Sequence, residues 1–228
     1  MAALKEPIGR SRHYWLTLLV GVWFPLLVFS VLAVTVGWYG DGFLWETPIL
    51  QAVHATVQPE LDEFARTLTK FGVFWGVFPV ATITGLVLLY QQRWRSLLYL
   101  AITLFSNIVI NRTAKLFFHR VRPHLWEVPL PEPDYSFPSG HAMSSMTLVA
   151  VVVVLTWGTR WCGWVLVSGS IFVVAIAWTR LYLGVHYPSD ILAGWMLSLA
   201  WAIAASLLVQ PNQPFVDRSV ESNSPDFS

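Results

Sequence analysis

Lys115 and Arg122 are two basic residues near the end of an apolar block, seven positions apart in the sequence. Seven residues span about two helical turns, so both side chains lie on one face if a helix persists through them. No acidic residue lies between them, and two fixed cations on one face would form an anion-binding site. The alternative is that both are membrane-flanking cations that extend from a helix end towards water.

A second polar segment, Pro138-Ser139-Gly140-His141, stands directly before an apolar run of helical length. Ser139 is suited to cap the N-terminus of that helix, and Gly140 lets a ligand approach the backbone. The first N–H groups of a helix have no intrahelical partner, and they attract phosphate together with the positive end of the helix dipole. Taken alone, however, an ordinary capped helix start explains the tetrapeptide more simply.

The third polar segment contains His186 and Asp190, which bracket Pro188. Proline fits the first turn of a helix, and residues four apart on a helix are neighbours. The Asp190 carboxylate can therefore bind one imidazole nitrogen and leave the other free, which is how a histidine nucleophile is oriented. A purely structural His–Asp pair at a helix end is the alternative.

All three segments border long apolar blocks, and the composition is that of a membrane protein. The 228 residues are 55% hydrophobic and only 12% charged, against about 25% charged in an average soluble domain. About 20 apolar residues cross a bilayer as a helix. Six blocks approach that length, and the predicted spans cover residues 14–38, 73–90, 96–118, 141–157, 162–183 and 191–209. We expect an all-α bundle of six transmembrane helices forming a single domain, 1–209. The net charge of +1 gives no support for nucleic acid binding.

The distribution of basic residues predicts the orientation of these spans. With a cytoplasmic N-terminus, the cytoplasmic side holds most of them, as membrane proteins generally do. They are Lys5, Arg10, Arg12, Arg93, Arg95, Arg160 and Arg218. The three polar segments then fall together on the opposite, extracytoplasmic side. The C-terminal segment 210–228 is rich in Pro, Ser and Asn, so we expect a disordered cytoplasmic tail.

The outer segment between the first two spans contains an apolar stripe. Leu61, Phe64, Ala65 and Leu68 recur at helical spacing after Pro59, with charged residues opposite. The stripe is typical of a helix that lies in the membrane interface. A short helix packed across the ends of the spans is an equally good interpretation.

Taken together, the three polar segments closely resemble the signature of the type-2 phosphatidic acid phosphatase superfamily, in its membrane lipid phosphatase branch. That signature is a Lys, six residues and Arg-Pro; then Pro-Ser-Gly-His; then Ser-Arg, five residues, His, three residues and Asp. The order and every spacing agree, and the one departure is a threonine in place of the commoner serine. This chain has Lys115…Arg122-Pro123, then Pro138-Ser139-Gly140-His141, then Thr179-Arg180…His186…Asp190.

The resemblance implies a role for each matched residue. His186 would attack phosphorus and form a phosphohistidine, Asp190 would orient His186, and His141 would protonate the leaving group. The phosphate oxygens would be bound by the remaining matched residues, which are Lys115, Arg122, Ser139, Gly140 and Arg180. The resemblance implies no metal or other cofactor. The acidic residues Glu127, Glu132 and Asp134 lie scattered in the outer loop, whereas magnesium requires several oxygen ligands close together.

The expected substrate is a membrane lipid phosphate or diphosphate on the extracytoplasmic face of a bacterial cytoplasmic membrane. By resemblance, candidates are undecaprenyl diphosphate, phosphatidylglycerol phosphate and phosphatidic acid. A phosphotransferase using a lipid diphosphate and, from another class, a transporter remain alternatives, and the oligomeric state is open. His119, Arg120 and His124 lie outside the signature. We interpret Arg120 as a solvated loop charge, with contact to a headgroup phosphate as the alternative.

Overall fold

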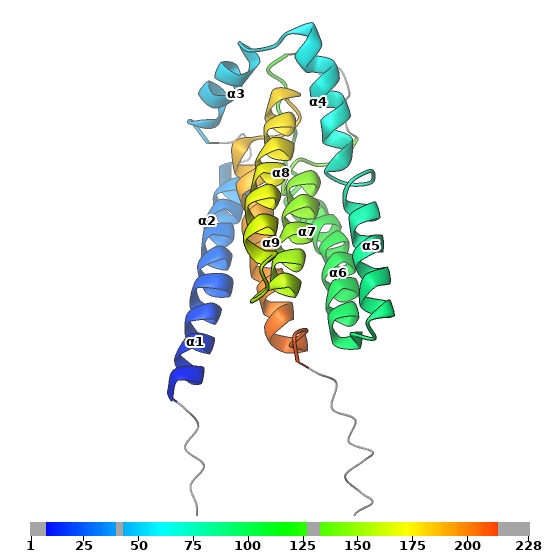
Figure 1. Cartoon of the computed structure of the whole chain (residues 1–228). Helices are drawn as coiled ribbons and strands as arrows, with labels where there is room; N and C mark the ends of the chain where they lie inside the picture. Colours follow the sequence, from blue (N-terminus) through cyan, green and yellow to red (C-terminus); the bar gives the residue numbers. More distant parts are fainter. Residues whose placement is uncertain (1–7, 40–42, 127–132, 214–228) are drawn as a thin grey trace, which may run out of the picture.

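The computed structural model describes residues 8–39, 43–126 and 133–213, and within them every regular element is a helix (Figure 1). The all-α prediction is therefore confirmed for the described part of the chain. The elements are α1 (Ile8–Leu18), a π-helical turn η1 (Leu19–Trp23), α2 (Phe24–Tyr39), α3 (Glu46–His54), α4 (Pro59–Phe71), α5 (Val77–Tyr90), α6 (Trp94–Phe118), α7 (Gly140–Thr156), α8 (Cys162–Tyr182) and α9 (Pro188–Val209).

Each predicted span corresponds to a helical rod, but the rods differ in length. Four are long and apolar enough to cross a bilayer, namely Arg12–Trp38, Trp94–Phe118, Cys162–Tyr182 and Pro188–Val209. The apolar helices Val77–Tyr90 and Gly140–Thr156 are shorter than these four; the second has the 17 residues of the predicted span 141–157, whereas the first has only 14 residues and is shorter than the predicted span 73–90. The first of these starts at Val77 and not at 73, because the preceding residues form turns.

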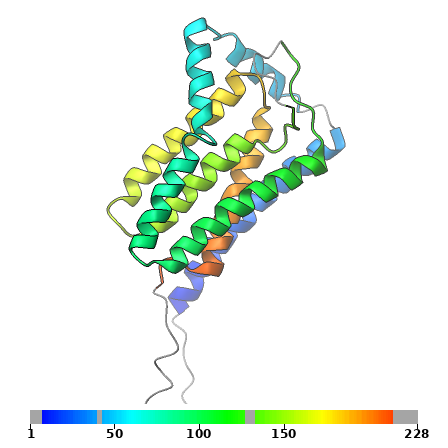
Figure 2. The same ribbon diagram turned by 90° about the vertical axis from the view of Figure 1, so that its right-hand side faces the viewer.

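The centre of the bundle is formed by α7 and α9, which also pack on α6, while α8 covers α7 and α2 covers α9 (Figure 2). Gly194 permits the close approach of α9 to the start of α7, since a Cβ there would lie 3.0 Å from the Ser139 carbonyl oxygen. Buried polar bonds also join these helices, as is common between membrane helices. Thr147 Oγ1 donates to Asn107 Oδ1 at 3.0 Å, and Ser198 Oγ donates to the Met143 carbonyl at 3.0 Å.

The two helices of the first outer segment, α3 and α4, lie at the end of the bundle opposite to the start of α1 and the end of α9 (Figure 1). The apolar stripe of α4 packs on the last turn of α8: Ala65 is fully buried there, with Leu61 and Tyr182. The Tyr182 hydroxyl donates to Asp62 Oδ1 at 2.8 Å. These contacts favour the second interpretation of the stripe, a helix packed across the ends of the bundle.

Residues 210–213, the start of the predicted tail, contact the bundle. Ser96 Oγ donates to the Pro211 carbonyl at 2.6 Å, and Asn212 Nδ2 donates to the Val154 carbonyl at 3.0 Å. The remainder of that tail, 214–228, lies outside the described residues, as do Lys5, Arg218, Glu127 and Glu132.

Candidate active site

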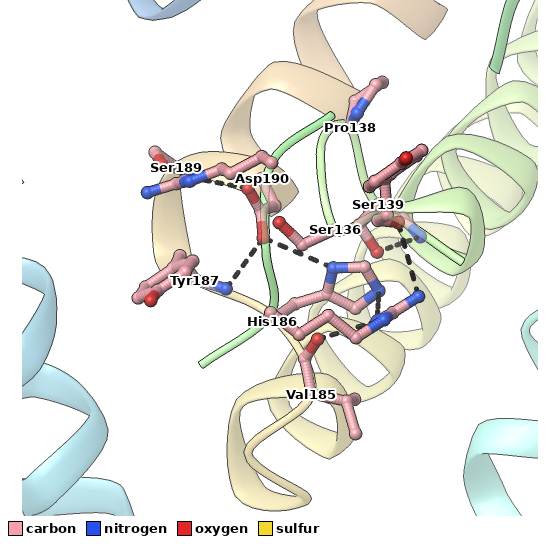
Figure 3. A network of polar contacts seen from close by, with 12 residues as sticks. Ser136, Pro138, Ser139, Val185, His186, Tyr187, Ser189 and Asp190 are labelled. Atoms are coloured by element: carbon pink, nitrogen blue, oxygen red, sulfur yellow. Dashed lines mark hydrogen bonds and ion pairs between the residues drawn. The ribbon is translucent and has the colours of Figure 1, made fainter. Parts of the chain in front are cut away.

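The three polar segments meet at the end of the bundle that α3 and α4 cover. Lys115 lies in the last turn of α6, His141 in the first turn of α7, and His186 directly before α9. Figure 3 shows two of these segments together, with Pro138 and Ser139 beside His186 and Asp190.

The imidazole of His186 is held between a carboxylate and a guanidinium. Its Nδ1 lies 3.3 Å from Asp190 Oδ2, which also accepts the Tyr187 N–H at 2.9 Å (Figure 3). Its Nε2 lies 3.0 Å from Arg122 Nη1. A guanidinium can only donate, so Nε2 must accept and Nδ1 must carry the proton that faces Asp190. The ring is therefore neutral, with its lone pair on the side away from Asp190, which is the arrangement that a nucleophile needs.

The turn that carries His186 depends on a glycine. Gly184 has a φ of +68°, and a Cβ there would lie 2.6 Å from Trp126 Nε1. Left-handed backbone and close packing both require glycine at this position. The Trp126 ring in turn stacks on His54 of α3, with centroids 3.9 Å apart. The outer segments therefore hold the turn in place.

Lys115 and Arg122 converge on one carboxylate, that of Asp134. Lys115 Nζ lies 2.6 Å from Asp134 Oδ2, and Arg122 Nη2 lies 2.5 Å from Asp134 Oδ1. The helix does not persist through both cations, because α6 ends at Phe118 and His119 takes a left-handed φ of 50°. Arg122 lies in the following loop and reaches Asp134 from there.

Asp134 is consequently not one of several scattered loop acids, as we had expected. Partial burial acts to raise its pKa, but the hydrogen bonds and charges of Lys115 and Arg122 outweigh that effect and lower the pKa from 3.8 to about 2. The loop backbone adds further acceptors, since Lys115 Nζ donates to the Tyr135 carbonyl at 2.6 Å and Arg122 Nε donates to the Asp134 carbonyl at 2.9 Å. The two cations therefore already bind an anionic group and its backbone.

The start of α7 has the cap that the sequence predicts. Ser139 is the N-cap residue, and its Oγ accepts the Ala142 N–H at 3.5 Å. Its own N–H donates to the Asp190 carbonyl at 3.0 Å, which ties the second motif to the third. His141 lies within the same group of charges, as Arg180, Lys115 and Arg122 all interact with its imidazole electrostatically.

Arg180 connects the third motif to the outer segment. It is buried in the last turn of α8, and its Nη1 donates to Thr69 Oγ1 of α4 at 2.8 Å. Because this bond comes from α4, the position of α4 affects the placement of Arg180, which is predicted to bind the substrate phosphate.

Arg120 is not the solvated loop charge that we had expected from the sequence. Its side chain is fully buried, with Nη1 2.5 Å from Asp190 Oδ1 and Nη2 2.7 Å from Glu46 Oε2. Sequence reasoning missed Glu46 altogether, since nothing local marks a residue that lies 74 positions from its partner. The only available signal for Arg120 was its place inside the first motif. His119 and His124, by contrast, are exposed.

Together these contacts supply a neutral imidazole whose lone pair faces an arginine, a buried carboxylate behind it, and several cations around a helix N-terminus. Phosphoryl transfer needs such positioning and charge stabilisation more than it needs covalent help from the protein.

Comparison with known proteins gives a consistent result. The family model of the PAP2 superfamily matches residues 95–214. The chain is 30% identical to an undecaprenyl-diphosphatase from Sulfolobus acidocaldarius over 211 residues, which cover 90% of this chain and 95% of that protein. It is also 30% identical to phosphatidylglycerophosphatase B from Bacillus subtilis, over 62% of this chain and 72% of that protein.

Two solved structures share the fold. The first is the crystal structure of a transmembrane PAP2-type phosphatidylglycerolphosphate phosphatase from Bacillus subtilis, with a TM-score of 0.72 and 24% identity over 84% of this chain and 97% of that one. The second is LpxE from Aquifex aeolicus, with a TM-score of 0.60 and 22% identity over 72% of this chain and 96% of that one.

Proposed function

Because the chain belongs to the PAP2 superfamily, we propose that it hydrolyses the phosphate monoester or diphosphate of a membrane lipid through a phosphohistidine on His186. The observation that carries this proposal is the environment of His186, whose Nδ1 faces Asp190 and whose Nε2 faces Arg122. The match to an undecaprenyl-diphosphatase along nearly its whole length makes a polyprenyl diphosphate the first substrate to test.

In the first step, His186 Nε2 attacks phosphorus while the bond to the leaving oxygen breaks. The positive charge that develops on the imidazole is stabilised by Asp190 across the Nδ1 contact. His141 gives a proton to the departing oxygen, and Arg122 turns its donors from His186 to the phosphate oxygens. In the second step, His141 takes a proton from water, which attacks phosphorus and releases inorganic phosphate and the free histidine.

The bilayer explains why such a site lies at the ends of helices. A lipid phosphate sits at the headgroup level while its tails remain in hydrocarbon, so catalytic groups at helix ends meet it without extracting the lipid. We propose six spans, with the shorter α5 and α7 among them, both termini in the cytoplasm and the site on the opposite side. The start of α1 and the end of α9 lie together at the end of the bundle opposite to α3 and α4, which supports this arrangement.

The test is phosphate release from undecaprenyl diphosphate, phosphatidylglycerol phosphate and phosphatidic acid in mixed micelles, with wild type and His186→Ala. We expect release from at least one lipid, and none with the variant. Thermal unfolding of both proteins controls for loss of fold. Full activity of His186→Ala would exclude the mechanism. Turnover that requires an added acceptor lipid and yields phosphorylated acceptor in place of free phosphate would identify a phosphotransferase.

A further inference from the structure

Behind Asp190 lies a buried ionic network that reaches the first outer segment. Arg120 binds Asp190 Oδ1 at 2.5 Å and Glu46 Oε2 at 2.7 Å, and Ser189 Oγ accepts from Arg120 at 2.7 Å. Ser189 donates its hydroxyl and, at 3.0 Å, its backbone N–H to Glu46 Oε1. The Phe43 N–H completes the set with a 2.6 Å bond to Glu46 Oε2.

This network does not contact a substrate directly. The side chains of Glu46, Arg120 and Asp190 have no solvent exposure, and both oxygens of Glu46 already accept two donors each. The Arg120 guanidinium also lies against the Tyr187 ring, 4.1 Å from its centroid. Burying three charges is costly, and neither Glu46 nor Arg120 occupies a signature position of the three motifs, so their burial calls for an explanation.

The net charge of this network suggests a reason for burying Glu46 and Arg120. A single guanidinium paired with Asp190 alone would cancel the negative charge that faces His186. Glu46 engages the other side of Arg120, so the network of two carboxylates and one cation keeps one net negative charge on the Asp190 side of the imidazole, opposite to Arg122. That charge has the sign required to stabilise the positive imidazole of an attacking histidine.

We propose that Glu46 and Arg120 are positioning residues for catalysis: Arg120 fixes the rotamer of Asp190, and Glu46 offsets the charge of Arg120 so that Asp190 still acts on His186. The inference rests on the proposed role of His186 as the nucleophile. It also makes α3, which begins at Glu46, part of the catalytic apparatus through the contact with Ser189 at the start of α9.

Opposite charges in this network should shift the pH profile in opposite directions. The acidic limb of kcat/KM reports the group that must be unprotonated in the free enzyme. Removing the negative charge in Glu46→Gln should move that limb to lower pH, and removing the positive charge in Arg120→Gln should move it to higher pH. At an effective dielectric constant of about 20, a unit charge roughly 12 Å away shifts the limb by about one pH unit, and a closer charge shifts it by more.

The experiment measures kcat, KM and the pH profile for the lipid that wild type turns over fastest. The other charged groups of the site remain unchanged in every variant: Arg122 and Asp190 contact the imidazole of His186, and Lys115, Asp134 and Arg180 act on His141. We expect kcat to fall at least tenfold in both single variants, with KM within twofold. Arg120→Lys is the matched control: it keeps the charge but lacks the planar guanidinium whose two nitrogens bind Asp190 and Glu46 separately, so kcat should fall while the limb stays in place.

The double variant Glu46→Gln/Arg120→Gln covers the case in which Arg120→Gln alone does not fold, because it removes the second buried carboxylate and restores the wild-type net charge of one negative. Its limb should lie close to that of wild type while its kcat is reduced, and a wild-type kcat would overturn the inference. Single variants whose limbs stay in place or move together, with His186→Ala inactive, would overturn this inference alone. If His186→Ala is active, the proposed nucleophile is wrong and the inference falls with it.

Discussion

Asp134 occupies the two cations that a substrate phosphate is expected to bind, so its removal should strengthen phosphate binding. Its carboxylate bridges Lys115 and Arg122 at 2.6 and 2.5 Å. A phosphate that binds the same two side chains must displace that carboxylate. We therefore expect Asp134→Asn, which keeps the size of the side chain, to lower the inhibition constant of inorganic phosphate.

The pKa of Asp134 gives the magnitude. Lowering the pKa from 3.8 to about 2 corresponds to about 2.4 kcal/mol of favourable interaction with the two cations. The side chain is 35% exposed, and solvent screening reduces this to about 1 kcal/mol. Phosphate should then bind about fivefold more tightly to the variant. Because the carboxylate stays ionised down to about pH 2, its competition is fully present at any assay pH above about 4 and declines only below that.

The assay is product inhibition of lipid phosphate hydrolysis at constant pH, with Glu63→Gln as the matched control. Glu63 is an exposed carboxylate on α4, so its removal tests the general effect of deleting one negative charge. An unchanged inhibition constant in the control and a fivefold lower one in Asp134→Asn would support the competition. Weaker phosphate binding in Asp134→Asn would refute it, since Asp134 would then be holding Lys115 and Arg122 in position for the phosphate.

Three further predictions follow from the site and from the turn that carries His186. His141→Ala should slow hydrolysis of a lipid alkyl phosphate at least tenfold more than that of an aryl phosphate, whose leaving group needs no proton; equal losses in kcat would contradict a general acid. Activity should survive excess EDTA, and strict loss that magnesium restores would show that a metal is required. Gly184→Ala should lower the melting temperature and kcat, because its φ of +68° and the Trp126 ring leave no room for a Cβ. Gly37→Ala, where a Cβ meets nothing within 4 Å, should change neither.

The sequence was sufficient for the features that depend on local spacing. Ser139 caps α7 and Pro188 begins α9 because these properties belong to single residues next to a helix start. The contact of His186 with Asp190 follows from four-residue spacing across such a start. The helical class follows from long apolar blocks, which satisfy their backbone hydrogen bonds internally.

The lengths of the rods were less predictable. Hydropathy predicts where an apolar block lies in the sequence, but it does not predict the residue at which the helix begins. The helix α5 starts four residues later than predicted, because the residues before it form turns. The end of α6 at Phe118 agrees with the predicted span 96–118, but the backbone turns at His119, so the helix does not continue through the basic residues that follow. Arg122 and Lys115 nevertheless meet at one carboxylate, because both bind Asp134 of the following loop.

Sequence by itself determined which residues could form the chemical groups of the site, since family spacing and residue type are local properties. Only the tertiary structure decided which carboxylate each cation meets. Asp134 lies 19 positions from Lys115, and Glu46 lies 74 positions from Arg120. Such pairs form because buried charges must find partners wherever the packed helices place them. No rule of spacing along the chain predicts that choice.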